Sequence, residues 1–144
     1  MTHYYTREEY EEAARSIRQK SDYRPRVGLI LGSGLNPLAE AVQDADIISY
    51  PDIPHFPKPT VEGHVGRLVL GTLEGTQVMI MQGRVHFYEG CPMPQVVFPV
   101  RVMQVMGIET LIVTNAAGGI DPTFQPGDLM LITDHLNLVG MGGS

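Results

Sequence analysis

The residues with the clearest chemical potential fall in one short stretch that holds a fixed cation, an imidazole, a phenol and a carboxylate. These are Arg84, His86, Tyr88 and Glu89, and glycines bracket the group. Arg84 and His86 are two residues apart, so in an extended chain their side chains point to the same side. A guanidinium and an imidazole on one side suit an anion with several oxygen atoms, such as phosphate.

The tyrosine and the glutamate of this stretch each admit more than one role. Tyr88 and Glu89 could hydrogen-bond a sugar hydroxyl, or they could hold Arg84 and His86 in position. For Glu89 we favour an ion pair with Arg84, because an acidic residue beside an arginine is commonly its partner.

Two glycine-containing loops are expected where buried strands end. The stretch with Arg84 follows the apolar run 78–81, and polar groups at the end of a buried strand commonly meet a ligand. The loop Gly32-Ser33-Gly34 stands between an expected strand and a short helix, where its N–H groups and the Ser33 hydroxyl could cradle an oxyanion. Its spacing matches neither a Walker sequence nor a dinucleotide fingerprint, and a simple tight turn is the alternative.

Two further segments could contact a ligand. His64 follows a proline-rich loop and lies between glycines, although an exposed loop histidine is the plainer interpretation. Residues 115–119 carry no bulky side chain, so either a ligand or a packed helix could lie against their backbone. The other histidines follow no metal-ligand spacing and are interpreted as structural or exposed: His3, His55 and His135.

Strand and helix signals alternate along the chain, which predicts an α/β fold with a mixed β-sheet flanked by helices. Thr6 and Glu9 form a capping box ahead of a helix at 7–20. A short helix is expected through Leu38 and Val42, and a longer one at 94–106. Strands are expected at 27–31, 47–50, 67–72, 76–81, 111–114 and 128–133, with a hairpin turn at 73–75, an edge strand at 47–50, and buried strands at 27–31, 76–81, 111–114 and 128–133.

Composition limits the class of protein. A length of 144 residues favours a single domain, 1–144. The net charge of −6 argues against a general nucleic-acid surface. One cysteine, Cys91, excludes a disulfide within the chain. No apolar run approaches the ~20 residues of a membrane span, and the polar N-terminus lacks a signal peptide, so we expect no membrane partner and a cytoplasmic location.

Four segments, taken in order, resemble the trimeric purine nucleoside phosphorylases of the inosine- and guanosine-cleaving type. One such match would be weak, but four at the right spacing are specific. The related methylthioadenosine phosphorylases differ around the Arg-His motif and the Asn-Ala-Ala-Gly-Gly stretch. The matching segments are 32–35, 61–66, 82–90 and 114–119.

This resemblance implies a glycosyltransferase of purine salvage. The reaction is the reversible phosphorolysis of purine (deoxy)ribonucleosides, such as inosine or guanosine, to the free base and (deoxy)ribose 1-phosphate. Orthophosphate is the co-substrate, and the resemblance implies no other cofactor and no metal. It also implies a homo-oligomer.

The resemblance assigns roles to individual residues. Arg84, His86 and His64 would be catalytic, and Tyr88 would contact the ribose. The residues implied to bind phosphate are Ser33, His64, Arg84, His86 and Ala116, the last through its backbone.

The resemblance covers only the N-terminal half of the family, so the fold is expected to be a truncated phosphorylase. The residues that bind the purine are expected in the missing half. The alternative function is a non-catalytic phosphate- or nucleoside-binding fragment, or one that only self-associates. A chain of this length would expose core surface and a sheet edge, and both favour self-association.

Overall fold

A five-stranded mixed sheet forms the centre of the computed structural model, which describes residues 3–57 and 66–136. The strand order is β2-β3-β4-β1-β5. β1 pairs in parallel with β4 and β5, whereas β2, β3 and β4 pair antiparallel. The predicted mixed α/β fold is confirmed. The elements are α1 Arg7–Lys20, β1 Val27–Ile30, α2 Asn36–Glu40, β2 Gln43–Ser49, β3 Arg67–Leu73, β4 Thr76–Gln82, α3 Met93–Met106 and β5 Thr110–Val113, with short 3-10 turns at Tyr50–Asp52 and Phe87–Glu89.

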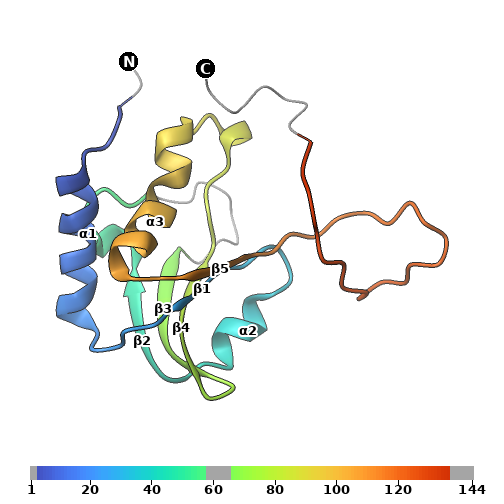
Figure 1. The fold of residues 1–144 in the computed structure, drawn as a ribbon, viewed down its shortest axis with the longest axis horizontal. Coiled ribbons are helices and arrows are strands. Elements are labelled where there is room, and N and C mark those ends of the chain that lie inside the picture. The colour runs from blue at the N-terminus through green and yellow to red at the C-terminus, as the bar shows by residue number, and fades with distance from the viewer. Residues whose placement is uncertain (1–2, 58–65, 137–144) are drawn as a thin grey trace.

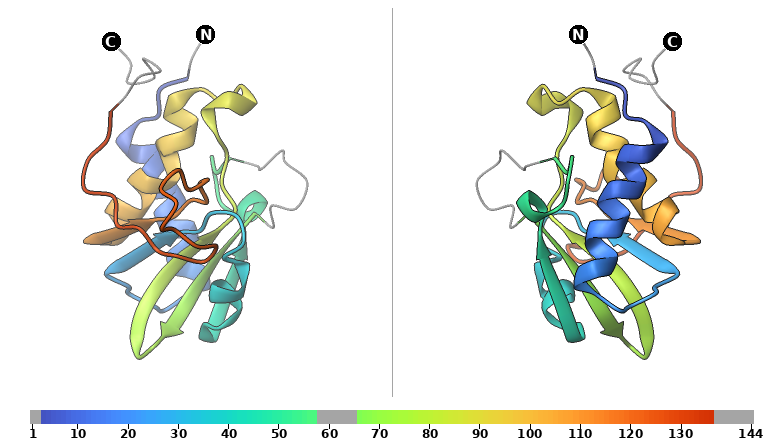
Figure 2. Two further views of the ribbon diagram at one scale, coloured as in Figure 1. Left: turned by 90° about the vertical axis from the view of Figure 1, so that its right-hand side faces the viewer. Right: turned by 90° about the vertical axis from the view of Figure 1, so that its left-hand side faces the viewer.

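Helices cover both faces of this sheet. α1 and α3 lie side by side on one face, and α2 lies on the other (Figures 1 and 2). The central strands β3 and β4 are buried on both faces, which explains their nearly continuous apolar sequences. Leu68, Leu70 and Met79 are fully buried among them, and each such side chain contributes roughly 1.5–3 kcal/mol to stability. No helix in the described ranges is long and apolar enough to cross a membrane.

Local signals placed most elements correctly. β3 and β4 are joined by Glu74 and Gly75, whose φ angles of 48° and 76° match a type I′ hairpin turn. α3 carries Pro94 in its first turn and ends at Gly107, whose φ is 97°. The edge strand expected at 47–50 is longer and forms β2.

Two expectations about the last strands are wrong. Residues 128–133 form no strand, because in the described chain they leave the sheet in an extended segment without a neighbouring strand (Figure 1). β5 forms as expected but is exposed rather than buried, since the described residues leave its outer edge uncovered. A strand needs a partner for its backbone groups, and the sequence pattern of one segment does not show whether that partner is present.

The predicted capping box begins α1. The hydroxyl of Thr6 accepts a hydrogen bond from the backbone N–H of Glu9 at 3.3 Å, and the Glu9 carboxylate accepts one from the backbone N–H of Thr6 at 2.6 Å. The apolar face of the helix then buries Ala13, Ala14 and Ile17. The capping contacts confirm the predicted start of the helix.

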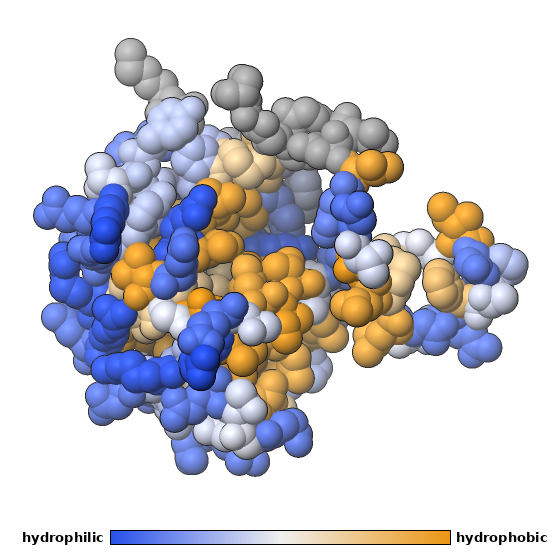
Figure 3. Space-filling view, viewed as in Figure 1, coloured by the Kyte–Doolittle hydropathy of each residue, from blue (hydrophilic) through white to orange (hydrophobic). Residues whose placement is uncertain are grey.

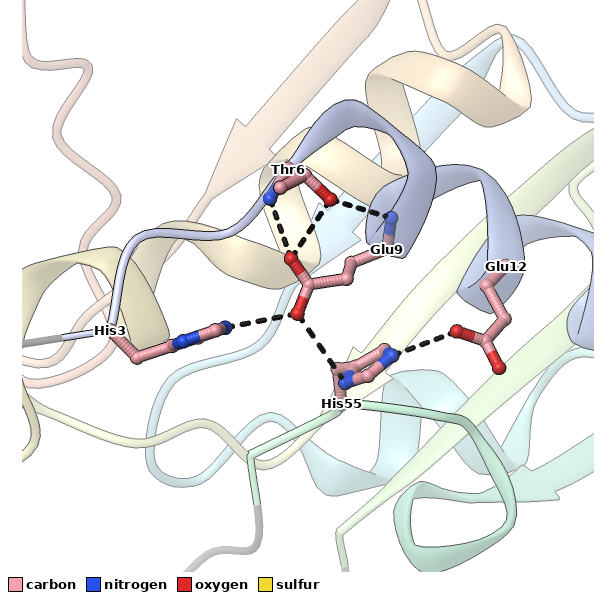
Figure 4. A network of polar contacts seen from close by, with 5 residues as sticks. All are labelled: His3, Thr6, Glu9, Glu12 and His55. Carbon is pink, nitrogen blue, oxygen red and sulfur yellow. Dashed lines mark hydrogen bonds and ion pairs between the residues drawn. The ribbon is translucent and has the colours of Figure 1, made fainter.

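Two histidines interpreted as structural or exposed have partners on α1. Nε2 of His3 lies 2.9 Å from Glu9, and Nε2 of His55 lies 2.9 Å from Glu12 (Figure 4). His55 also lies against the ring of Phe98, with centroids 6.1 Å apart. The contacts tie both the N-terminal segment and the turn before β3 to the first turns of α1.

The loops after β1 and β5 meet in a close contact that positions the candidate site. The N–H of Gly32 donates to the hydroxyl oxygen of Thr114 at 2.8 Å. A Cβ atom on Gly32 would lie 2.6 Å from the Thr114 carbonyl oxygen and 2.9 Å from Cα of Asn115. Only glycine fits between these backbones without displacing one of them.

This contact predicts that Gly32→Ala destabilises the protein whereas Gly118→Ala does not. The methyl group at position 32 would push the two loops apart and cost about 1–3 kcal/mol. At Gly118 a Cβ atom meets nothing within 4 Å, so the change should stay within about 0.5 kcal/mol. Urea unfolding of both variants measures the difference, and equal losses would contradict the close approach.

The capping box predicts a specific pH dependence of stability. Hydrogen bonds from the Thr6 backbone and from His3 lower the pKa of Glu9 to about 2, below its ordinary value of 4.5. A lowered folded-state pKa stabilises the protein above the unfolded-state pKa, and this contribution is lost as the pH falls through the folded-state pKa. The free energy of unfolding should therefore differ most between the parent and Glu9→Gln above pH 4.5, and this difference should shrink as the pH falls toward about 2.

Urea unfolding between pH 6 and about 2 tests this dependence. Glu8→Gln, in the same helical turn, controls for the loss of one negative charge. A stability difference for Glu9→Gln that stays constant across the range would show that the capping carboxylate does not act as described.

Candidate functional site

The candidate residues lie at one end of the sheet, where three parallel strands have their carboxyl ends. The loop with Arg84 follows β4, the loop with Ser33 follows β1, and the segment from Thr114 follows β5. β1 lies between the other two strands, so its loop is flanked by both. Ligands of proteins with open α/β sheets commonly bind at the carboxyl ends of the strands.

Arg84 connects the loops of β4 and β5. Its Nη1 donates to the carbonyl oxygen of Thr114 at 2.7 Å, and its Nε donates to Nε2 of His86 at 3.1 Å. The guanidinium is partly buried, so both contacts hold its plane in a fixed orientation. The expected pairing of Arg84 with His86 on one side of the chain is therefore present in the structure.

Glu89 pairs with His86, and the ion pair with Arg84 that we favoured from sequence is wrong. The Glu89 carboxylate accepts from the backbone N–H of His86 at 2.9 Å and makes a short contact with Nδ1 of the same ring. Its side chain is only 6% exposed. The cause is the 3-10 turn at Phe87–Glu89, which folds position 89 back over position 86.

These contacts fix the hydrogen-bonding roles of the imidazole. A guanidinium can only donate, so Nε2 of His86 accepts from Arg84. Nδ1 then carries the proton and donates to Glu89. Glu89 therefore orients the ring and directs the Nε2 lone pair toward the guanidinium.

Tyr88 stacks on His86 at the outer side of the site. The ring centroids lie 4.8 Å apart with an interplanar angle of 16°. Tyr88 is 79% exposed, so its phenol faces open space beside the imidazole. This position agrees with either contact to a sugar or support of the imidazole, the two roles left open by the sequence.

The other expected site residues lie next to the contact between the loops. Ser33 directly follows Gly32 on an exposed turn, and Ala116 is exposed two residues after Thr114. The carbonyl oxygen of Ala116 accepts from Nδ2 of Asn115 at 3.2 Å. His64 lies outside the described residues, so its expected position near phosphate stays a prediction.

Two residues to which the sequence analysis gave no site role support the loops. The hydroxyl of Thr114 donates to the carbonyl oxygen of Ile30 at 3.2 Å. The hydroxyl of Tyr50 donates to the carbonyl oxygen of Gly83 at 2.6 Å, and burial raises the pKa of this tyrosine. Tyr50 is 33 residues from its partner, and no local pattern indicates such a contact.

The arrangement favours an anion, bound by hydrogen-bond donors, over a metal ion. Within residues 3–57 and 66–136, no three histidine, cysteine, aspartate or glutamate side chains lie together as a metal site would need. Arg84 supplies the cation at the point where the loops of β4 and β5 meet.

Comparison with known proteins agrees with this fold. The model of the phosphorylase superfamily matches residues 26–144. Purine nucleoside phosphorylase 1 of Bacillus subtilis is 58% identical over 130 residues, which cover 90% of this chain and 48% of that protein. The mouse (Mus musculus) purine nucleoside phosphorylase is 51% identical over 143 residues, covering 99% of this chain and 50% of that protein.

Solved structures give the same result. A purine nucleoside phosphorylase in complex with ribose-1-phosphate superposes with a TM-score of 0.80 at 42% identity, over 88% of this chain and 47% of that chain. A Schistosoma enzyme in complex with hypoxanthine gives 0.79 at 40% identity, over 88% and 44%. The chain thus spans about half the length of the relatives it matches. The superfamily match over most of the chain, with these identities and this fold, shows that it belongs to the purine nucleoside phosphorylase family.

Proposed function

We propose that the chain carries the phosphate-binding half of a site for reversible phosphorolysis of purine (deoxy)ribonucleosides. Its products would be the free purine and (deoxy)ribose 1-phosphate. The observation that carries this proposal is the contact between Arg84 and His86 at 3.1 Å, at the carboxyl ends of three parallel strands. A related structure contains ribose-1-phosphate and another contains hypoxanthine, which supports the same substrate class here.

Arg84 is the main anion donor in this proposal. A guanidinium carries five N–H groups, and the contacts to Thr114 and His86 engage two of its nitrogen atoms. The remaining donors can bind phosphate oxygens, and charge-assisted hydrogen bonds of this kind contribute about 1.5–3 kcal/mol each. A hydrogen phosphate that enters between the two side chains can accept from Arg84 and donate its P–OH to Nε2 of His86.

The remaining residues complete the phosphate site. Ser33 and the backbone at Ala116 would donate from the loops of β1 and β5, and His64 would approach from its own loop. Tyr88, stacked on His86, would contact the ribose.

The proposed chemistry follows from holding the nucleophile. As the glycosidic bond breaks, the sugar develops positive charge at its anomeric carbon. A phosphate held by fixed donors then acts both as the attacking nucleophile and as the counter-charge. Such a site needs correct placement of the phosphate, which Arg84, His86 and Glu89 supply through one connected set of hydrogen bonds. The departing purine would be bound by residues beyond those described.

A second candidate function is a phosphate- or nucleoside-binding fragment without turnover. The chain spans 48–50% of the length of its bacterial and mouse relatives. Incubation with inosine and phosphate, followed by measurement of hypoxanthine, separates the two. Hypoxanthine release supports the phosphorylase, whereas saturable phosphate binding without release supports the fragment.

The proposed role of Arg84 predicts that Arg84→Gln lowers phosphate affinity by at least about tenfold, or 1.4 kcal/mol. The matched control is Arg101→Gln, which removes the same charge from an exposed position on α3 and should leave the affinity within about twofold. Isothermal calorimetry with inorganic phosphate measures both. Equal losses in the two variants would show that general charge, and not this site, binds the anion.

A further inference from the structure

A buried tyrosine hydroxyl holds the backbone directly before Arg84. Tyr50 follows β2 and is 1% exposed. Its hydroxyl donates to the carbonyl oxygen of Gly83 at 2.6 Å. The ring packs on Phe56, with centroids 5.1 Å apart, and belongs to the core cluster beneath α1 and α3. The donor is therefore held in place by packing on the side away from its acceptor.

The register of the sheet brings these two residues together. β2 and β4 both pair antiparallel with β3, so they run in the same direction. Ser49 of β2 and Gln82 of β4 both align with Arg67. Tyr50 and Gly83, the next residue on each strand, therefore leave the sheet at the same end, although they are 33 residues apart in sequence.

Hydrogen bonds close a ring at this end of the sheet. The backbone N–H of Tyr50 donates to the carbonyl oxygen of Gly66 at 2.9 Å, and the N–H of Gly66 donates to the carbonyl oxygen of Gln82 at 3.0 Å. The hydroxyl of Tyr50 completes the ring at Gly83, which is bonded covalently to Gln82. Because each bond restricts the groups that make the others, the loss of one loosens the rest.

Gly83 is the position at which such support matters most. Its φ angle is 100°, in the region that favours glycine, and a glycine backbone has more rotational freedom than that of any other residue. The peptide bond is planar, so the carbonyl oxygen of Gly83 and the N–H of Arg84 rotate together. A bond that fixes this carbonyl oxygen therefore also fixes the direction in which Arg84 leaves the strand.

Arg84 is thus held at both ends, from opposite sides of the sheet. Thr114, after β5, holds the tip of its side chain, whereas Tyr50, after β2, holds its backbone. In the described chain, apolar side chains of β5 lie at the surface in the middle of the face shown in Figure 3. The contact of Tyr50 is buried at the other side, so it does not depend on what lies against β5.

We propose that Tyr50 is a positioning residue of the candidate site, which raises its affinity for phosphate by holding the peptide between Gly83 and Arg84 in one orientation. Without the hydroxyl, the buried carbonyl oxygen of Gly83 would lose its donor, and the peptide could rotate to find another. Phosphate would then bind only the fraction of molecules in which Arg84 points into the site. The inference rests on the proposed phosphate site, but the orientation of the peptide can be measured without phosphate.

Two tyrosine variants test the effect on binding. The hydroxyl of Tyr23 also donates to a backbone carbonyl oxygen, that of Asp44, at 2.9 Å and near the start of β2, at the opposite end of the sheet. Tyr50→Phe should raise the dissociation constant for inorganic phosphate at least about fivefold, which corresponds to an Arg84 in the binding orientation for at most about a fifth of the time. The control Tyr23→Phe should change it by less than about twofold. Isothermal calorimetry measures both, and circular dichroism checks folding.

Nuclear magnetic relaxation of the Arg84 amide nitrogen tests the positioning itself, in the absence of phosphate. In the unaltered chain its order parameter should be about 0.85, as in rigid backbone. In Tyr50→Phe it should fall toward about 0.6, or the amide should show relaxation dispersion if the rotation is slower. Tyr23→Phe should leave both unchanged. A purely structural loss would lower stability in either variant without this local change at Arg84.

Three results would overturn the proposal. The first is an equal phosphate affinity of Tyr50→Phe and the parent, and the second is an equal loss in Tyr50→Phe and Tyr23→Phe. The third is an Arg84 amide that is already mobile in the unaltered chain, with an order parameter below about 0.6, and this result decides the question if Tyr50→Phe does not fold. If the unaltered chain binds no phosphate, the proposed function fails, and relaxation still shows whether Tyr50 holds the peptide.

Discussion

The candidate site depends on the hydrogen bonds of Thr114. Its backbone N–H and its hydroxyl both donate to the carbonyl oxygen of Ile30, at 3.1 and 3.2 Å. Its hydroxyl oxygen accepts from Gly32, and its carbonyl oxygen accepts from Arg84. One residue at the end of β5 therefore links the ends of β1 and β4. A position with this many bonds is geometrically fixed, and that is what an anion site with separate donors requires.

The site keeps a positive charge although the chain as a whole is acidic, because the described contacts pair Arg84 with groups that carry no full negative charge. The net charge is −6, yet Arg84 is held by one carbonyl oxygen and one imidazole nitrogen, neither of which carries a full negative charge. Glu89, the nearby carboxylate, is directed to the far side of His86. If it paired with Arg84 instead, it would neutralise the cation that an anion needs. The turn at Phe87–Glu89 thus separates the two charges, although they lie only five residues apart in sequence.

The sequence predicted the contacts between residues that are close together in the chain, and it missed those between residues that are far apart. The cap of α1 and the turn at Glu74 and Gly75 depend on residues within a few positions of one another, and both were predicted. The spacing of Arg84 and His86 is also local, and it predicted that the two side chains lie on the same side of the chain. The partner of Glu89 was missed because it was inferred from the closeness of Glu89 to Arg84 in the sequence, whereas a 3-10 turn brings position 89 to position 86. Tyr50 and Gly83 are 33 residues apart, and His55 and Glu12 are 43 apart, so no local pattern indicated either contact. The expected strand at 128–133 does not form, because an apolar segment becomes a strand only where a neighbouring strand can pair with it.

β5 connects the proposed phosphate site to the rest of the sheet. Its last residue leads directly into Thr114, which orients Arg84. Phosphate bound to Arg84 and to the loop after β5 would restrict the motion of Thr114 and of the exposed segment that follows it. Any other contact that orders the same segment would therefore favour phosphate binding, and by linkage the effect is equal in both directions.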